Sequence, residues 1–206
     1  MRGRLGILLS GRGSNFEAIA DHIERGELDA QIAVVISNAS QAPGLEKARQ
    51  RGLEAIFIGS KGLSREEFDR RLVSTLKEEQ VDLVCLAGFM RLLSSYFIKS
   101  FPHRILNIHP SLLPSFPGLN AQQQALEHGV KYTGCTVHFV DEGLDSGPII
   151  LQAVVPVLDN DTEQTLSARI LAEEHEIYSR AIQLVLDNQT RVEGRRVLRV
   201  ATTECT

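Results

Sequence analysis

Two polar residues, Asn107 and His109, stand at the end of an apolar run and just before a proline-rich loop. If a strand ends here, residues two apart project from the same side and reach the carboxyl edge of the sheet, where ligands of open α/β folds bind. An amide donor and an imidazolium can stabilise the oxyanion that forms when a nucleophile attacks a carbonyl. The pair therefore indicates a carbonyl site. A hydrogen-bonded structural Asn and His at a strand end is the alternative.

A catalytic histidine usually has an orienting carboxylate, which stabilises the cationic imidazole. The loop DEGLDSG offers three acids for this role, Asp141, Glu142 and Asp145. Sequence spacing alone does not choose among them, and a solvated acidic turn is the alternative reading of the loop. The role of His138, which lies just before this loop, is also ambiguous. It can be a site residue or a partly buried residue of a strand.

A glycine-containing segment, SGRGSN, runs from Ser10 to Asn15 between an apolar run and a predicted helix that starts near Phe16. Gly11 and Gly13 let the backbone approach a ligand, and the amides of a helix start favour an anion, so a phosphate is the expected guest. A dinucleotide is disfavoured because Phe16 replaces the third glycine of the G-x-G-x-x-G pattern. A turn that merely connects strand and helix is the alternative.

Several other chemistries find no support in the sequence. Ser111 lies near His109, but no G-x-S-x-G elbow is present, so serine hydrolysis is discounted. The six histidines show no H-E-x-x-H or similar spacing, which makes a metal site improbable. Cys85, Cys135 and Cys205 form no C-x-x-C pair, so each is interpreted as a structural thiol.

Short apolar runs rather than alternating ones recur along the first half of the chain, as a sheet buried on both faces requires. They are Leu5 to Leu9, Ile32 to Ile36, Ala55 to Ile58, Val81 to Ala87 and Ile105 to Ile108. Segments with helical spacing lie between them, and Ser64 to Glu67 reads as a capping box for a helix that ends near Gln80. This alternation predicts a parallel sheet with right-handed crossovers.

The pattern changes after Gly118. We predict a short helix at Gln122 to His128, followed by two strands at Thr133 to Val140 and Pro148 to Val157. A long amphipathic helix is predicted at Thr162 to Asp187. The polar tail from Thr190 onward is expected to contain one short strand near Val197 to Val200. The second strand is expected to be antiparallel or at an edge because prolines bound it. The fold class predicted is α/β, a single-domain, doubly wound, mostly parallel sheet with an antiparallel strand or edge in the C-terminal part.

Composition and charge narrow the possible partners. The chain has 206 residues, of which 43% are hydrophobic and 23% charged, with a formal net charge of −4. This balance gives no overall electrostatic footprint for nucleic acid. Because no targeting segment or membrane-length apolar run is found, we expect a cytoplasmic protein with no membrane partner.

Five segments together resemble the phosphoribosylglycinamide formyltransferases, which are folate-dependent formyltransferases. They are SGRGSN, LAGFMRLLS from Leu86, NIHPSLLPSFPG from Asn107, GCTVHFVDEGLDSGPII from Gly134 and EEHEIYSR from Glu173. The resemblance runs from Ile7 to about Asp187, with the motifs in the family's order. It implies a Rossmann-like formyltransferase fold with a catalytic domain at 1–189, divided into a phosphate-binding half at about 1–100 and a folate and catalytic half at about 101–189. Residues 190–206 are then a C-terminal tail.

The resemblance also implies a reaction. The formyl group of 10-formyltetrahydrofolate, a cosubstrate, passes to the amine of glycinamide ribonucleotide in de novo purine biosynthesis, with direct amine attack and no metal. It implies small-molecule substrates only and a monomer or a homodimer. Methionyl-tRNA formylation and formyltetrahydrofolate hydrolysis are disfavoured, because the chain leaves no room for the additional domains of those relatives. Formyl transfer to a sugar nucleotide and a binding protein without turnover remain alternatives.

Residue roles carried over from the family cover three groups of residues. The resemblance implies that the catalytic set is Asn107, His109 and Asp145. It implies that the phosphate and ribose are bound by Gly11, Arg12, Gly13, Ser14, Asn15 and Glu174. It implies that the folate is bound by Arg65, Met90, Arg91, Leu92, Leu93 and Asn107.

The sequence departs from the family at two of the quoted segments. Ser179 stands where the family often has proline, which we expect to affect only helix packing. Asn120 replaces a histidine that is common in the family, which puts any contact from that side chain in doubt. A cis peptide is also expected before Pro114.

Overall fold

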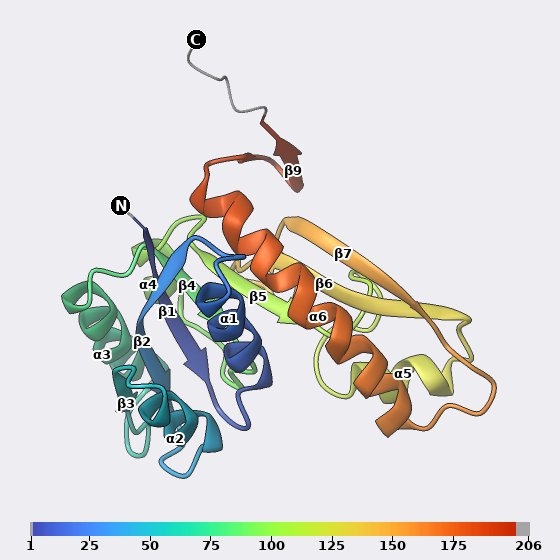
Figure 1. Cartoon of the computed structure of the whole chain (residues 1–206), viewed down its shortest axis with the longest axis horizontal. Coiled ribbons are helices and arrows are strands. Elements are labelled where there is room, and N and C mark those ends of the chain that lie inside the picture. Colours follow the sequence, from blue (N-terminus) through green and yellow to red (C-terminus); the bar gives the residue numbers. More distant parts are fainter. Residues whose placement is uncertain (1, 201–206) are drawn as a thin grey trace. The chain divides into compact units, whose positions relative to one another are not determined.

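The computed structural model describes residues 2–200, and this part of the chain contains nine strands and six helices, which alternate as far as β6. Figure 1 shows their arrangement. These residues form two compact units. The first contains residues 2–107 and Val140–Glu142, and the second contains Ile108–Phe139 and residues 143–200. Residues 201–206, the end of the predicted tail, lie outside the described part together with Cys205.

The first unit is built on a parallel sheet. Its strands are β1 (Gly3–Leu9), β2 (Ala30–Ser37), β3 (Ala55–Phe57), β4 (Leu83–Leu86) and the start of β5 (Ile105–His109). They follow the order β3-β2-β1-β4-β5, and all of these neighbouring pairs are parallel. The five apolar runs in the sequence therefore correspond to these five strands, as expected for a sheet covered on both faces.

Helices connect the parallel strands of this unit (Figure 1). They are α1 (Ser14–Glu24), α2 (Pro43–Gln50), α3 (Arg65–Glu78) and α4 (Ser95–Ser100). The predicted capping box is present at α3, where Ser64 Oγ accepts a hydrogen bond from Glu67 N–H and the Glu67 carboxylate accepts one from Ser64 N–H. Satisfying these two amides defines where α3 begins.

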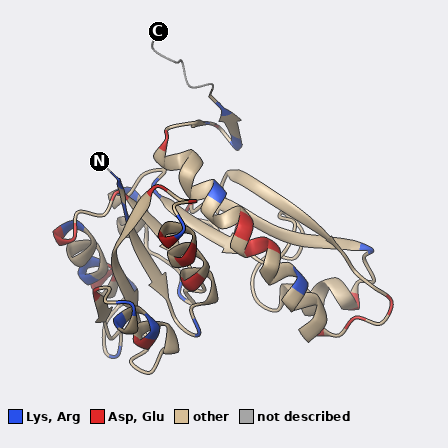
Figure 2. Ribbon diagram, in the orientation of Figure 1, with Lys and Arg blue, Asp and Glu red and all other residues tan. Residues whose placement is uncertain are grey.

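The helices of the first unit are held by two kinds of contact. α3 and α4 bury Phe68, Leu72 and Phe97 against strand residues such as Leu8 and Val84 in one hydrophobic cluster. α1 and α2 are joined by charges, because acidic side chains of α1 pair with Lys47 of α2 and with Arg51, its C-cap. Figure 2 shows the acidic positions on α1 in red and basic positions on α2 in blue. These ion pairs are Glu17–Lys47, Asp21–Arg51 and Glu24–Arg51.

The second unit combines an antiparallel sheet with a long helix. It contains α5 (Ala121–Glu127), β6 (Tyr132–Phe139), β7 (Ile149–Pro156), α6 (Glu163–Leu186), β8 (Thr190–Glu193) and β9 (Arg196–Arg199). β6 and β7 pair antiparallel, and a Cβ on Gly134 would lie 1.8 Å from the carbonyl oxygen of Ala153 on the neighbouring strand. Glycine is therefore required at this position of β6.

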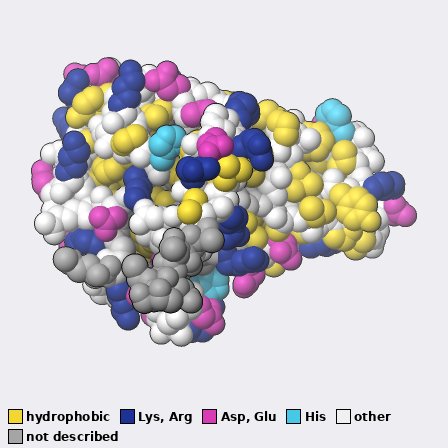
Figure 3. Space-filling model, turned by 90° about the horizontal axis from the view of Figure 1, so that it is seen from above, with side chains coloured by type: hydrophobic (Ala, Val, Ile, Leu, Met, Phe, Trp, Pro, Cys, Tyr) yellow, Lys and Arg dark blue, Asp and Glu magenta, His cyan; other side chains and the backbone are white. Residues whose placement is uncertain are grey.

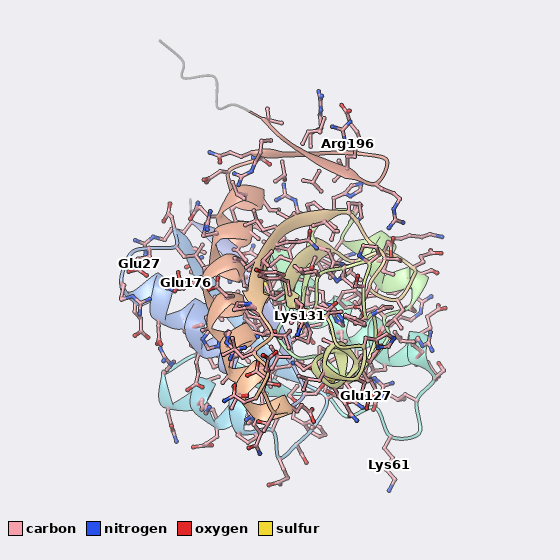
Figure 4. All side chains as sticks on the ribbon, turned by 90° about the vertical axis from the view of Figure 1, so that its right-hand side faces the viewer. Glu27, Lys61, Glu127, Lys131, Glu176 and Arg196 are labelled. Carbon is pink, nitrogen blue, oxygen red and sulfur yellow. The ribbon has the colours of Figure 1, made fainter. Side chains whose placement is uncertain are left out.

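The expected antiparallel strand and the long C-terminal helix are confirmed, and α6 starts with Thr162 as its N-cap. The short strand predicted near Val197 to Val200 is present as β9, and the prediction missed β8, which pairs with β9 as an antiparallel hairpin. Arg196 of β9, labelled in Figure 4, also pairs in parallel with Ile149 of β7. The polar sequence of β8 shows no apolar periodicity, since both of its faces are at least partly exposed.

The surface of the described residues carries scattered apolar side chains, and none of the described helices is long and apolar enough to cross a membrane. Tyr132, Val154 and Leu158 of the second unit are among the exposed large hydrophobic residues. Figure 3 shows hydrophobic side chains gathered toward the right-hand end of the face in view. Such exposure is common on folded proteins, where much of the accessible surface is apolar.

The loop between β7 and α6 is fixed by the carboxylate of Asp161. Arg169 donates from Nη1 to Asp161 Oδ2 at 2.8 Å and from Nη2 to Oδ1 at 2.9 Å, and Leu158 N–H donates to Oδ2 at 2.7 Å. Arg169 Nη1 also donates to the carbonyl oxygen of Pro156, the last residue of β7. The hydrogen bonds from Arg169, followed by the one from Leu158, hold the pKa of Asp161 well below its ordinary value.

We predict that Arg169→Met lowers the melting temperature at pH 7 by a few degrees and by a smaller amount at pH 3. The folded-state pKa of Asp161 lies below its unfolded-state value, which is about 3.9. The ion pair therefore stabilises the fold above that value, and its contribution is lost as the pH falls through it toward the folded-state pKa. Circular dichroism melting curves at both pH values measure the effect.

Arg49→Met is the matched control, because Arg49 and Glu46 form an exposed pair at 3.7 Å and such pairs contribute little. An equal loss in melting temperature at pH 7 and pH 3 for Arg169→Met would contradict the assignment to the Asp161 charge.

Candidate active site

Asn107 and His109 lie two residues apart on β5, as the sequence predicts. Residues at this spacing on a strand project from the same side. Asn107 pairs in register with Leu86, the last residue of β4, and His109 is the last residue of β5. Both side chains therefore stand near the carboxyl ends of parallel strands, which is where ligands of such sheets bind.

The imidazole of His109 is 5% exposed and has an acceptor near each nitrogen. Nε2 lies 2.9 Å from the carbonyl oxygen of Phe116, and Nδ1 lies 3.4 Å from Asp145 Oδ2. A carbonyl oxygen and a carboxylate oxygen are hydrogen-bond acceptors, so each ring nitrogen of His109 faces an acceptor.

Asp145 adopts an uncommon backbone conformation, with a φ of 47°. For a residue other than glycine this left-handed conformation costs roughly 1–2 kcal/mol. It is compensated by side-chain contacts, since Asp145 Oδ2 accepts a hydrogen bond from Gly118 N–H at 2.8 Å and also faces His109. Asp145 Oδ1 lies 3.8 Å from His138 Nε2. The carboxylate thus lies between two imidazoles and a backbone amide.

His138, which was ambiguous in the sequence, is a buried residue of β6 with 2% of its surface exposed. Its Nδ1 lies 2.8 Å from the carbonyl oxygen of Phe139, which can only accept, so Nδ1 carries a proton. This contact turns Nε2 toward Asp145. Of the three acids in the DEGLDSG loop, the structure places Asp145 beside His109 and His138.

The loop after His109 is held by a polar cluster that sequence reasoning missed. Thr136 Oγ1 donates to the carbonyl oxygen of Ser111 at 2.7 Å and accepts from Leu113 N–H at 3.1 Å. Gln152 Nε2 donates to Thr136 Oγ1 at 2.9 Å and to the carbonyl oxygen of Leu113 at 3.0 Å. These bonds join the loop to β6 and β7. The expected cis peptide is present between Leu113 and Pro114.

The glycine segment of the first unit leads directly into a helix. α1 begins at Ser14, two residues before the predicted start, and Gly13 is its N-cap with a φ of 74°. A Cβ on Gly13 would lie 3.0 Å from the Cα of Gly44, so the close approach of the two backbones also requires glycine. The first-turn amides of α1 and its dipole are arranged as an anion site requires.

Residues predicted to bind folate also lie in the first unit. Met90 and Leu92 are 69% and 55% exposed, and Arg65 is exposed in the first turn of α3. The Arg91 guanidinium lies 4.7 Å from the centre of the Phe68 ring and donates from Nη1 to Ser60 Oγ at 3.0 Å. Arg91 Nε is buried and has no hydrogen-bond partner among residues 2–200.

Glu174, the predicted ribose contact, is 7% exposed on α6 in the second unit. Burial, followed by the negative charges of Glu174 and Glu173, raises the pKa of the Cys135 thiol to about 12. Cys135 is therefore protonated near neutral pH, in agreement with a structural thiol. Among residues 2–200, no group of three or more histidine, cysteine or acidic side chains could hold a metal ion.

Comparison with known proteins decides which family has this arrangement. The model of the formyl transferase family matches residues 3–182. The chain belongs to the formyl transferase family. Its structure is similar to that of glycinamide ribonucleotide transformylase 1 from Symbiobacterium toebii, with a TM-score of 0.95, 54% identity, and coverage of 97% of this chain and 95% of that one. The chain therefore has the α/β fold expected from its sequence.

Curated relatives of this chain differ in length. The phosphoribosylglycinamide formyltransferase of Escherichia coli is 44% identical over 90% of this chain and 88% of the relative. The human trifunctional purine biosynthetic protein adenosine-3 is 50% identical, but the match covers 89% of this chain and only 18% of that protein. The chain thus spans less than a fifth of the trifunctional relative.

A formyltetrahydrofolate deformylase from Pseudomonas syringae has a similar structure as well. Its TM-score is 0.91 at 27% identity, and the match covers 98% of this chain and 67% of the deformylase chain. The same fold is therefore found in a deformylase as well. Similarity of fold alone does not identify the molecule that would accept a formyl group.

Proposed function

We propose that this protein is a phosphoribosylglycinamide formyltransferase. It transfers the formyl group of 10-formyltetrahydrofolate to the amine of N1-(5-phospho-D-ribosyl)glycinamide, giving the N2-formyl product and tetrahydrofolate in de novo purine biosynthesis. The observation that carries the proposal is the pair formed by His109 and Asp145, with an acceptor at each nitrogen of the imidazole. Such a pair keeps a cation where a carbonyl oxygen becomes negative.

In this mechanism the substrate amine attacks the formyl carbon directly, and no covalent enzyme intermediate forms. The new carbon–nitrogen bond turns the formyl oxygen into an oxyanion. His109, held cationic by Asp145, and the amide of Asn107 stabilise that oxyanion. The bond to the folate nitrogen then breaks, and a proton passes from the attacking nitrogen to the departing one. We propose that this proton moves through a water molecule near Asp145.

The phosphate of the ribonucleotide is assigned to Gly11, Arg12, Gly13, Ser14 and Asn15. Support comes from the left-handed Gly13 at the start of α1, whose first-turn amides favour an anion. This requirement for a phosphate favours the ribonucleotide over acceptors that lack one. Glu174 is assigned to the ribose.

Folate binding is assigned to Arg65, to Met90, Arg91, Leu92 and Leu93, and to Asn107. The exposed side chains of Met90 and Leu92 provide apolar surface for a ring system. A ligand acceptor at the buried Nε of Arg91 would satisfy that donor. The cytoplasmic location and the monomeric or homodimeric state expected from the sequence remain predictions.

We predict formyl transfer with glycinamide ribonucleotide as the acceptor. The change in folate absorbance is followed with purified protein and 10-formyltetrahydrofolate, first alone and then with the ribonucleotide, methionyl-tRNA or a 4-amino-sugar nucleotide. The expected result is turnover only with the ribonucleotide. Folate consumption without an acceptor would instead identify a deformylase, and no reaction in any tube would favour a binding protein.

We predict that Asp145→Asn lowers kcat by at least about a hundredfold with little change in either KM. The amide cannot compensate a positive charge on His109, so the pH–rate profile is displaced as well. Stopped-flow or steady-state rates over the range pH 5–9 measure both effects.

Asp141→Asn and Glu142→Gln are matched controls for Asp145→Asn, because they remove one charge each from the same loop. A displaced profile in either control, together with an unchanged profile in Asp145→Asn, would assign the orienting role to another acid.

We predict that Gly13→Ala lowers kcat/KM for the ribonucleotide by roughly ten- to a hundredfold, because the loop must shift away from Gly44. Gly26→Ala is a matched control, since Gly26 has the same φ of 74° but nothing within 4 Å of its added Cβ. It is expected to lose some stability and keep its kinetics. Equal kinetic losses in both variants would show that backbone strain alone explains the effect.

A further inference from the structure

Ser10, just before the glycine segment, uses its hydroxyl group for two long-range hydrogen bonds. Its Oγ donates to Asn38 Oδ1 at 2.6 Å and accepts from Met90 N–H at 2.8 Å. Its backbone N–H donates to the carbonyl oxygen of Gly88 at 3.0 Å. These partners follow two different strands, β2 and β4, and Ser10 itself follows β1, so this one residue connects three loops of the first unit.

The positions of these loops follow from the sheet. Ser10 comes directly after β1, Asn38 directly after β2, and Met90 lies in the segment after β4. β1 pairs in parallel with both β2 and β4, so the three carboxyl ends meet at one edge. Ser10 follows the middle strand and is the residue that can reach both neighbouring loops.

Ser10 is joined to two segments that are assigned to different substrates, to one by the chain itself and to the other by a hydrogen bond. The phosphate segment begins at Gly11, immediately after Ser10, and the folate segment begins at Met90. We propose that Ser10 is a positioning residue that sets these two segments relative to each other, and thereby couples binding of the ribonucleotide phosphate to binding of the folate. This inference deepens the proposed function and rests on it.

A hydroxyl group suits this role because it is a donor and an acceptor at once. Removing it leaves Met90 N–H and Asn38 Oδ1 without the partner that joins the two loops. Neither substrate is expected to contact the Ser10 side chain, so effects on both substrates must pass through the loops. Linkage then requires that each substrate changes the affinity of the other by the same factor.

The test compares Ser10→Ala with the wild-type full chain. Since the variant removes one ordinary hydrogen bond to the folate segment, Ser10→Ala is expected to raise KM for both substrates by about three- to tenfold, with kcat changed by less than about twofold. Titration calorimetry with each substrate, alone and in the presence of the other, is expected to show a smaller coupling factor than in the wild type.

Two further variants separate positioning from general destabilisation. Ser37→Ala is the matched control, because Ser37 Oγ also donates and accepts at a strand end, but both bonds are local and go to Ala39. Its two KM values are expected to stay at wild-type levels. Ser10→Thr keeps the hydroxyl group and is expected to restore both KM values.

Hydrogen–deuterium exchange gives a readout that does not depend on turnover. In Ser10→Ala, peptides that cover residues 10–15 and 88–93 are expected to exchange faster together, whereas Ser37→Ala affects only the region after β2. Asn38→Ala, which removes one of the two hydroxyl bonds, is expected to show the same pattern with smaller changes.

The outcomes of these experiments distinguish this inference from the proposed function. Absence of wild-type turnover with the ribonucleotide would overturn the proposed function. Normal wild-type turnover with a Ser10→Ala variant that changes only one KM, or neither, would overturn the role of Ser10 alone. Matching effects in Ser37→Ala would overturn it too, because they would show a loss common to this edge of the sheet.

Discussion

Parallel pairing of β2, β1 and β4 is the constraint on which the first unit's candidate binding segments depend. In a parallel sheet the carboxyl ends of neighbouring strands meet at one edge, and the loops that follow them must share that edge. The glycine segment, the turn after β2 and the segment at Met90 therefore come together although they are far apart in sequence. β1, β2 and β4 all end in buried residues, which fixes where the loops after them begin. Short polar loops can then carry the chemistry without contributing to the core.

The second unit holds the carboxylate of Asp145 close to the imidazole of His109 at the end of β5. The antiparallel β6–β7 pair carries His138 and the Thr136–Gln152 cluster. The loop between β6 and β7 places Asp145 beside His109. The left-handed backbone of Asp145 is unfavourable by itself and is retained because its carboxylate has several donors. Strain of this kind persists where the surroundings over-determine the geometry, and it is frequent at functional sites.

Local sequence patterns predicted most of the helices and strands. They did not predict the hydrogen bonds between residues that are far apart in the sequence. The apolar runs marked the five parallel strands and the Ser64–Glu67 box marked the start of α3, because burial and capping leave a residue pattern in the chain itself. β8 was missed because an exposed strand needs no such pattern. The hydrogen bonds of Ser10 and Gln152 cannot be recognised from a local residue pattern, since each joins segments that are far apart in the sequence. Asp145 was selected by resemblance to a family, not by spacing.

The substitution of Asn120 for the family's common histidine has a backbone explanation. Asn120 is the N-cap of α5 with a φ of 56°, and its side chain makes no capping hydrogen bond. Asparagine tolerates this left-handed conformation better than most residues, because its short polar side chain suits local hydrogen bonding. The residue therefore serves the turn that leads from the Pro117–Gly118 segment into α5, and Gly118 N–H contacts Asp145 from this same turn. Conformational preference at position 120 can thus support the orienting carboxylate without any contact from the side chain to a ligand.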